Sequence, residues 1–328
     1  METVPSAPRS VRRSAVLVFL AGLLVYNANL RLIGSGDSIP ARLLPLAILN
    51  HRTMYLDAYG PRPDNAYWFT YSRTGRLVSF YPVVLPVLVT PLFVPAAIYF
   101  ERVDAPAWKI QVVGEMAEKF AASVVASLSV VVVWLLLRRL ASVGTALGLT
   151  AAYAFGTQTW STSSQALWQH GLGQLLLASA LFLLMRPESS RGTPALLGAV
   201  TALLAFNRPP DALFALAIAV FVLVRRRREV LTFAVGGVLA GIPFLAYNLW
   251  MFGRPLGGYQ SLVGSDVFGH DVPEGIAALL VSPGKGLLVF APFLLFLLRS
   301  PLAVFDMERR LLGILLWGAF LAQVTIYA

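Results

Sequence analysis

The chain has 328 residues, of which 57% are hydrophobic and 13% charged, and its mean hydropathy is +0.71. This composition excludes an ordinary soluble globular protein and predicts an all-α polytopic membrane protein. The net charge of +10 does not indicate nucleic-acid binding, because the arginines cluster at the ends of apolar segments, and the absence of cysteine excludes disulfides and thiolate metal sites.

Residues 14–33 form the first predicted membrane span, because as a helix they cover about 30 Å, the thickness of a hydrocarbon core. Arg9, Arg12 and Arg13 precede this span, so residues 1–13 are expected to be a cytoplasmic tail. No small-x-small cleavage site follows the apolar run. We therefore expect a retained helix rather than a cleaved signal peptide.

Residues 34–119 are predicted to form a long first exoplasmic loop that carries juxtamembrane helices. Within it, residues 83–100 are apolar enough to cross a membrane, but a crossing would reverse the charge bias of the later loops. Four prolines recur along this segment: Pro82, Pro86, Pro91 and Pro95. Prolines at this spacing favour a broken, re-entrant or juxtamembrane element, with a kinked ordinary span as the alternative.

Residues 120–328 are predicted to hold the remaining helices, so that residues 14–328 form one transmembrane domain. Arginines at the ends of the apolar segments predict which ends are cytoplasmic, as at residues 138–139 and 225–228. The chain stops inside an apolar segment. We therefore expect an incomplete last helix and a chain that is truncated relative to a longer protein.

Two apolar segments, residues 195–206 and 212–224, are too short to cross a bilayer, since each covers about 18–20 Å as a helix. Between them lies Asn207-Arg208-Pro209-Pro210-Asp211. This pattern predicts a helical hairpin whose tip holds Arg208 at depth. An arginine in that position usually faces a cavity or an anion. The alternative is an Arg208–Asp211 pair that only closes the turn.

The polar residues expected at the outer end of the helices are one carboxylate and several cationic or polar groups: Asp37, Arg42, His170, Arg208 and Lys285. Lys285 lies in a glycine-rich turn, where it could approach a phosphate or instead reach lipid headgroups. No Ser-His-Asp order, HExxH or phosphate-binding loop is present. A single carboxylate with cations suits transfer of a group from a phosphate-linked donor.

No cofactor is predicted, and a divalent metal is unsupported by any motif. The three histidines, His51, His170 and His270, are too far apart in sequence to form a recognisable metal site. Asp37, Asp57 and Asp64 could supply oxygen ligands, but their spacing matches no known motif.

The order of several short motifs along the chain extends the interpretation of Asp37 and the cations as a group-transfer site. They are the Asp37 turn after the first helix, the approach at 76–82 to the proline-rich segment, Tyr153–Thr157, the Arg208 tip, residues 247–253 and the turn at 282–286. This order resembles the GT-C membrane glycosyltransferases, particularly the branch of protein O-mannosyltransferases and lipid A aminoarabinose transferases. The resemblance covers nearly the whole chain.

The resemblance implies a GT-C-like transmembrane helix bundle in a bacterial inner membrane. It implies an inverting transfer from a polyprenyl-phosphate sugar at the exoplasmic face, with Asp37 as base and phosphate contacts from Arg208 and Lys285. The implied partners are this donor, an acceptor that is protein, lipid or glycan, and membrane lipid, with no nucleic acid. Ser38 follows Asp37 where the mannosyltransferase pattern pairs two acids, which leaves the sugar and the acceptor open.

Two other functions remain open at this point. A transporter or flippase of a lipid-linked anion would also use broken helices and an intramembrane arginine. The long loop near the N-terminus has no counterpart in the second half, so no inverted repeat supports this alternative. A non-catalytic membrane scaffold would leave Asp37 and Arg208 without a shared cavity.

Overall fold

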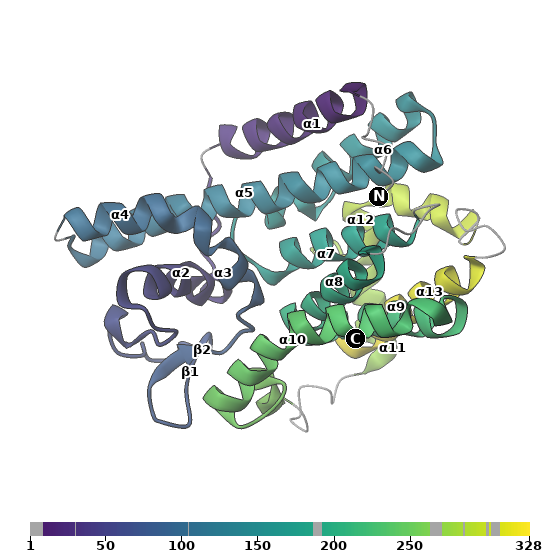
Figure 1. Cartoon of the computed structure of the whole chain (residues 1–328). Coiled ribbons are helices and arrows are strands. Elements are labelled where there is room, and N and C mark those ends of the chain that lie inside the picture. The colour runs from purple at the N-terminus through teal and green to yellow at the C-terminus, as the bar shows by residue number, and fades with distance from the viewer. Residues whose placement is uncertain are drawn as a thin grey trace, which may run out of the picture.

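The computed structural model describes residues 9–29, 31–103, 105–185, 192–262, 271–284, 286–299, 302 and 309–328. The described chain is a bundle of α-helices with one small two-stranded sheet at its edge (Figure 1). This confirms the predicted all-α class.

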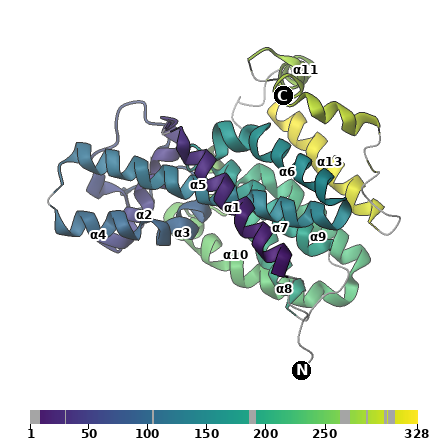
Figure 2. The ribbon, with the colours of Figure 1, turned by 90° about the horizontal axis from the view of Figure 1, so that it is seen from above.

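The helices of the bundle proper follow one another along the chain: α1 (Arg9–Ala28), α5 (Ala107–Leu140), α6 (Val143–Phe155), α7 (Gln169–Leu184), α8 (Thr193–Asn207), α9 (Ala212–Arg225), α10 (Val230–Phe252), α11 (Val272–Val281), α12 (Leu287–Phe290) and α13 (Arg310–Tyr327). Helix α1 lies along α5 in both ribbon views (Figures 1 and 2). Helix α5 also packs on α7, α8 packs on α10, and α9 packs on α13. The apolar residues between α7, α8, α9 and α13 form a continuous buried cluster.

In the part of the chain that the structure describes, five helical segments are long and apolar enough to cross a bilayer: Ser10–Ala28, Val84–Arg102, Trp108–Leu140, Arg227–Phe252 and Arg310–Tyr327. Many of their large apolar side chains are exposed on the outside of the bundle, for example Leu24, Leu239 and Trp250. Apolar surface of this kind suits a lipid environment.

The first helix begins and ends about five residues earlier than predicted, because it covers Arg9–Ala28 rather than residues 14–33. Two asparagines account for the early end. The Asn27 amide donates to the Leu23 carbonyl, and the Asn29 side chain accepts from the backbone N–H of Arg31 at 3.1 Å. Such local side-chain bonds offer the backbone an alternative to another helical turn.

The predicted first loop is compact and structured. After α1 the chain forms a 3-10 turn (Gly36–Ser38), helix α2 (Ile39–His51) and a second 3-10 turn (Asp57–Tyr59). Strands β1 (Phe69–Tyr71) and β2 (Leu77–Ser79) then pair antiparallel, with Tyr71 opposite Leu77. The sequence interpretation did not predict this hairpin.

The proline-rich segment is broken, as predicted. Helix α3 (Val84–Val89) and helix α4 (Val94–Arg102) are separated by a 3-10 turn, Thr90–Phe93. Pro91 has no N–H to donate, and the Thr90 hydroxyl instead bonds the Pro86 carbonyl at 2.8 Å. The position of this segment relative to a membrane stays a prediction.

Helix α5 is longer than predicted, because it begins at Ala107 rather than near residue 120. Its 34 residues cover about 51 Å, well beyond the thickness of a hydrocarbon core. The extra turns pack on α2 and α4 (Figure 1). Residues 107–119, expected within a loop, therefore form a helical support for the segment that follows α1.

The hairpin predicted around Arg208 is confirmed. Helices α8 and α9 are joined by a short 3-10 turn, Pro209–Asp211. Arg208 ends α8 because its backbone is extended, with φ −157°, and two prolines follow it. Arg208 at the hairpin tip lies near the segments that follow α1 and α10.

The close contact between α8 and α10 generates a stability prediction. A Cβ atom on Gly198 would lie 1.8 Å from the Phe233 carbonyl oxygen, and one on Gly236 would lie 1.9 Å from the Ala195 carbonyl oxygen. We expect Gly198→Ala to separate the two helices and to destabilise the fold by about 1–3 kcal/mol or more. The measurement is the thermal unfolding temperature of the detergent-purified protein.

Gly237→Ala is the matched control, because a Cβ atom there would lie 3.4 Å from the Gly198 carbonyl oxygen, an ordinary contact. Equal unfolding temperatures for Gly198→Ala and the unchanged protein would contradict the packing assigned to α8 and α10.

Candidate functional site

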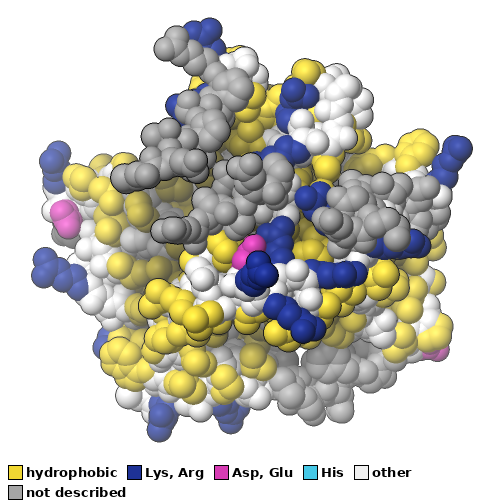
Figure 3. Space-filling view, turned by 45° about the vertical axis from the view of Figure 1, so that its right-hand side comes forward, with side chains coloured by type: hydrophobic (Ala, Val, Ile, Leu, Met, Phe, Trp, Pro, Cys, Tyr) yellow, Lys and Arg dark blue, Asp and Glu magenta, His cyan; other side chains and the backbone are white. Residues whose placement is uncertain are grey.

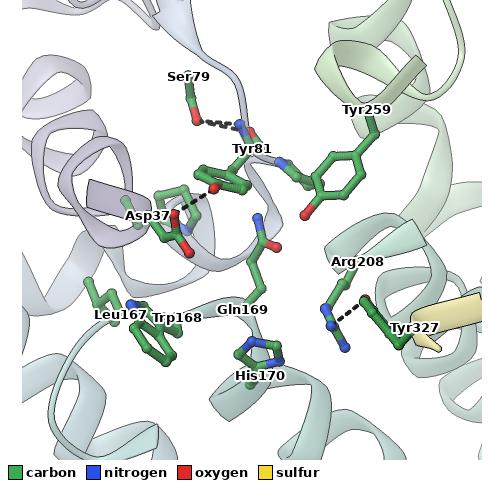
Figure 4. Close-up of a pocket in the computed structure, with 13 residues that line it drawn as sticks. Asp37, Ser79, Tyr81, Leu167, Trp168, Gln169, His170, Arg208, Tyr259 and Tyr327 are labelled. Carbon is green, nitrogen blue, oxygen red and sulfur yellow. Dashed lines mark hydrogen bonds between the residues drawn. The ribbon is translucent and has the colours of Figure 1, made fainter. Parts of the chain in front are cut away.

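A cavity of about 250 Å³ opens where the start of α2, the segment before α3, the start of α7 and the α8–α9 tip meet (Figure 4). The polar and aromatic residues that line it are Asp37, Ser79, Tyr81, Trp168, Gln169, His170, Arg208, Tyr259 and Tyr327. Three of the five residues predicted from the sequence, Asp37, His170 and Arg208, therefore lie in one cavity.

Asp37 is held in the 3-10 turn that follows α1. Its backbone N–H donates to the Ser35 hydroxyl oxygen at 3.3 Å, which caps the turn. Gly36 lies directly against the Trp68 ring, since a Cβ atom there would be 2.3 Å from a ring carbon. The turn can therefore come close to Trp68 only with glycine at this position, and Asp37 projects into the cavity.

Tyr81 is the nearest polar partner of Asp37, and its hydroxyl donates to Asp37 Oδ1 at 2.6 Å (Figure 4). Burial, and then the hydrogen bond to Asp37, raises the pKa of Tyr81, so this hydroxyl remains a donor at neutral pH. Ser79 fixes the Tyr81 backbone, because its Oγ accepts from the Tyr81 N–H at 3.0 Å and donates to the Tyr81 carbonyl at 2.9 Å. A hydrogen bond to Asp37 also raises the pKa of Tyr67.

Arg208 enters the cavity from the hairpin tip on a different wall from Asp37 (Figure 4). Its Nη1 lies 3.2 Å from Asp211 Oδ1, and its Nη2 is hydrogen-bonded to the Tyr327 hydroxyl. The Gln323 amide also donates to Asp211 at 3.2 Å. The Arg208–Asp211 pair considered as an alternative is therefore present, and Arg208 lines the cavity while it makes this pair.

Leu167 and Trp168, together with the first two residues of α7, form the floor between these two walls. The Gln169 carbonyl accepts from the Asn207 amide at 2.9 Å, which joins the start of α7 to the end of α8. The Trp168 and His170 rings are in edge contact, with centroids 5.9 Å apart. The Gln169 side chain projects upward between Tyr81 and Tyr259 (Figure 4).

Tyr259 completes the cavity from the 3-10 segment Gly257–Leu262 that follows α10. Its ring stacks on Phe80 with centroids 5.7 Å apart and meets the Tyr81 ring at 6.1 Å. Gly258 permits this approach, because a Cβ atom there would lie 2.2 Å from the Phe80 carbonyl oxygen. Burial raises the pKa of Tyr259 to about 12, so its hydroxyl remains available as a hydrogen-bond donor.

The other two predicted residues do not join this group. Arg42 does not line the cavity, because its Nη1 contacts Glu115 Oε1 at 3.1 Å and Glu118 Oε2 at 3.4 Å on α5. The sequence interpretation placed residues 107–119 in a loop and so missed these two acidic partners. Lys285 lies outside the described residues.

A metal site finds no support among the described residues, since none of their His, Asp and Glu side chains gather in groups of three or more. Asp57, considered above as an oxygen ligand, accepts from the Leu77 N–H at 2.9 Å and from Arg76 Nε at 3.0 Å. Its carboxylate therefore anchors β2 to the preceding turn.

Comparison of the chain with protein-family models, curated proteins and solved structures yields no match. The geometry of the cavity and the resemblance of the motif order are therefore the basis for any functional assignment.

The burial of Arg42 beside Glu115 and Glu118 generates a second prediction. The Arg42 and Glu118 side chains are 11% and 5% exposed, so Arg42→Ala would leave a buried carboxylate without its cation. We expect a loss of about 3–5 kcal/mol in the free energy of unfolding. Denaturant unfolding of the purified protein measures it.

The ion pair of Arg76 with Asp57 provides the control, because its side chains are 50% and 41% exposed. Arg76→Ala should cost no more than about 1 kcal/mol. Similar losses for both variants would show that the Arg42 pair is not buried in solution.

Proposed function

We propose that this protein is an inverting membrane glycosyltransferase of the GT-C type that uses a polyprenyl-phosphate sugar as donor at the exoplasmic face. The observation that carries the proposal is that a carboxylate and an arginine line one cavity, although they come from segments far apart in the chain. Asp37 follows the first helix, and Arg208 forms the tip of the α8–α9 hairpin.

The distribution of charge supports an orientation in which the cavity faces the exoplasmic side of the membrane. Basic residues lie at the end of α5 and between α9 and α10, and the face of the bundle seen in Figure 3 carries many Lys and Arg side chains beside broad hydrophobic areas. The positive-inside rule assigns such an end to the cytoplasm. Helix α1 runs from the basic N-terminal segment toward the cavity, which favours an exoplasmic cavity in a bacterial inner membrane.

The chemistry follows from the roles that the two charges can take. The Asp37 carboxylate removes the proton from an acceptor hydroxyl, and the acceptor oxygen forms a bond to the anomeric carbon of the sugar. The bond from this carbon to the phosphate oxygen breaks at the same time, and the phosphate leaves with the electron pair. The Arg208 guanidinium stabilises the charge that develops on this phosphate.

The neighbouring residues suit the same reaction. Tyr81 and Tyr67 donate to the Asp37 carboxylate, which still lines the cavity and has further lone pairs that can accept from an acceptor hydroxyl. Gln169 and the Tyr259 hydroxyl offer neutral hydrogen bonds of the kind that bind sugar hydroxyls, and the tyrosine rings offer apolar faces. The sugar and the acceptor, whether protein, lipid or glycan, are left open by these contacts.

A transporter or flippase of a lipid-linked anion is the second candidate. The broken α3–α4 segment and the α8–α9 hairpin are features that transporters also use. The polar residues of the cavity gather at one end of the bundle, whereas a flippase needs access from both faces. Sealed right-side-out vesicles with radiolabelled donor in the outer leaflet separate the two: transfer yields a labelled acceptor, whereas flipping only moves the label across the membrane.

Asp37→Asn tests the role of the base. The amide keeps the shape of the side chain but cannot accept a proton, so we expect sugar transfer to fall by about 100- to 10,000-fold while donor binding is preserved. The measurement is transfer from a polyprenyl-phosphate sugar by the purified variant, with donor affinity measured in parallel. Turnover close to that of the unchanged protein would remove Asp37 from this role.

Arg208→Ala tests the phosphate contact. Loss of a charge-assisted hydrogen bond should weaken binding of polyprenyl phosphate by about 10- to 100-fold. Arg254→Ala is the control, because Arg254 is exposed and does not line the cavity. If donor affinity is the same in both variants, Arg208 serves only to close the hairpin with Asp211.

A further inference from the structure

Glu118 is a buried carboxylate that lies beside the cavity without lining it. It is on α5, and only 4% of its surface is exposed. Burying a carboxylate in an apolar bundle is unfavourable unless its oxygens are paired, so its partners indicate why it is there.

The two oxygens of Glu118 bond to two different segments beside the cavity. Oε1 accepts from the backbone N–H of Leu167 at 3.1 Å, and Leu167 begins the cavity floor that continues to His170. Oε2 lies 3.4 Å from Nη1 of Arg42, on the helix that directly follows the Asp37 turn. Ser38, the neighbour of Asp37, also contacts the Glu118 carboxylate.

Glu118 thus connects Leu167 to Arg42, and we call this connection the bridge. The residues around Glu118 have shapes and partners that suit it. A Cβ atom on Gly114 would lie 3.2 Å from Arg42 Cδ, so glycine at this position lets the arginine lie across α5. The next residue of α5, Lys119, donates to the Ser164 carbonyl at 3.1 Å and to Gln165 Oε1 at 2.6 Å. Helix α5 therefore holds the segment before α7 at both of its ends.

We propose that Glu118 is a positioning residue that sets the spacing between Asp37 and the Leu167–His170 floor. The expected effect on catalysis rests on the proposed function. The structural part of the inference concerns only the distance between the Asp37 turn and the Leu167–His170 floor. Positioning matters because a shift of about 1 Å between a base and its reactants can cost about 100-fold in rate.

Two substitutions separate the bridge from a simple role in neutralising Arg42. Glu118→Ala removes both bonds, whereas Glu118→Gln keeps an oxygen that accepts from the Leu167 N–H and loses the charge and the acceptor for Arg42, which Glu115 still pairs. Glu115→Ala is the matched control, because Glu115 contacts Arg42 and, among the described residues, makes no hydrogen bond to the cavity floor.

The first readout is sugar transfer under steady-state conditions. We expect Glu118→Ala to lower kcat by about 10- to 100-fold with the donor KM within about threefold, because Arg208 is held by other residues. Glu118→Gln and Glu115→Ala should retain most of the activity. Unchanged kcat in Glu118→Ala, or equal losses in Glu118→Ala and Glu118→Gln, overturns the proposal.

The second readout does not depend on the transferase assignment. The chain has no native cysteine, so a Gly34→Cys and Ser161→Cys pair can carry two spin labels without background labelling. Both positions are exposed, and they precede the Asp37 turn and the Ser164–Leu167 segment respectively. We expect one narrow distance distribution for this pair and a shifted or broadened one when Glu118→Ala is added.

The two readouts distinguish the two claims. Suppose that Glu118→Ala broadens the spin-label distance distribution, but that neither the unchanged protein nor any variant transfers sugar. This result supports the bridge and contradicts the proposed function. A distribution that Glu118→Ala leaves unchanged overturns the bridge whatever the activity. If Glu118→Ala does not fold, the same pair is measured with Glu118→Asp, whose shorter side chain keeps the charge but cannot reach both Arg42 and Leu167. A shifted or broadened distribution in Glu118→Asp supports the bridge, and an unchanged one overturns it.

Discussion

A charge inside this apolar bundle must find a partner or face a cavity, because neither hydrocarbon nor packed side chains solvate it. Arg42 meets Glu118, and Arg208 meets Asp211. Asp37 differs, since no ion pair among the described residues includes it and its short hydrogen bond comes from a neutral tyrosine. A carboxylate that faces a cavity and has only neutral hydrogen-bond donors around it suits acid–base chemistry better than structural pairing.

The helices and the segment after α1 cooperate to place this carboxylate. Helix α5 extends beyond the length that a membrane needs, and its additional turns support α2 and the floor before α7. The α8–α9 hairpin is held to α10 by glycines that permit backbone contact, and its tip brings Arg208 to the same end. The cavity therefore depends on helix packing that is distant from it in sequence.

Local signals in the sequence predicted much of this arrangement. Proline spacing predicted the break between α3 and α4, and short apolar runs around Asn207–Asp211 predicted the hairpin. The grouping of Asp37, His170 and Arg208 followed from assigning the ends of spans to one side. Tyr81 and Tyr259 were missed because their roles arise from contacts between distant segments, and tyrosine is common in this chain. The partners of Arg42 were missed because the start of α5 was placed 13 residues too late.

The central claim is that Asp37 and Arg208 act on one lipid-linked phosphate donor within a shared cavity. A cryo-electron microscopy structure of the protein with bound polyprenyl phosphate tests it most directly. The account predicts the phosphate at hydrogen-bond distance from the Arg208 guanidinium, with the Asp37 carboxylate across the cavity and open to an acceptor. A phosphate bound elsewhere, with Arg208 still engaged only by Asp211 and Tyr327, would contradict it.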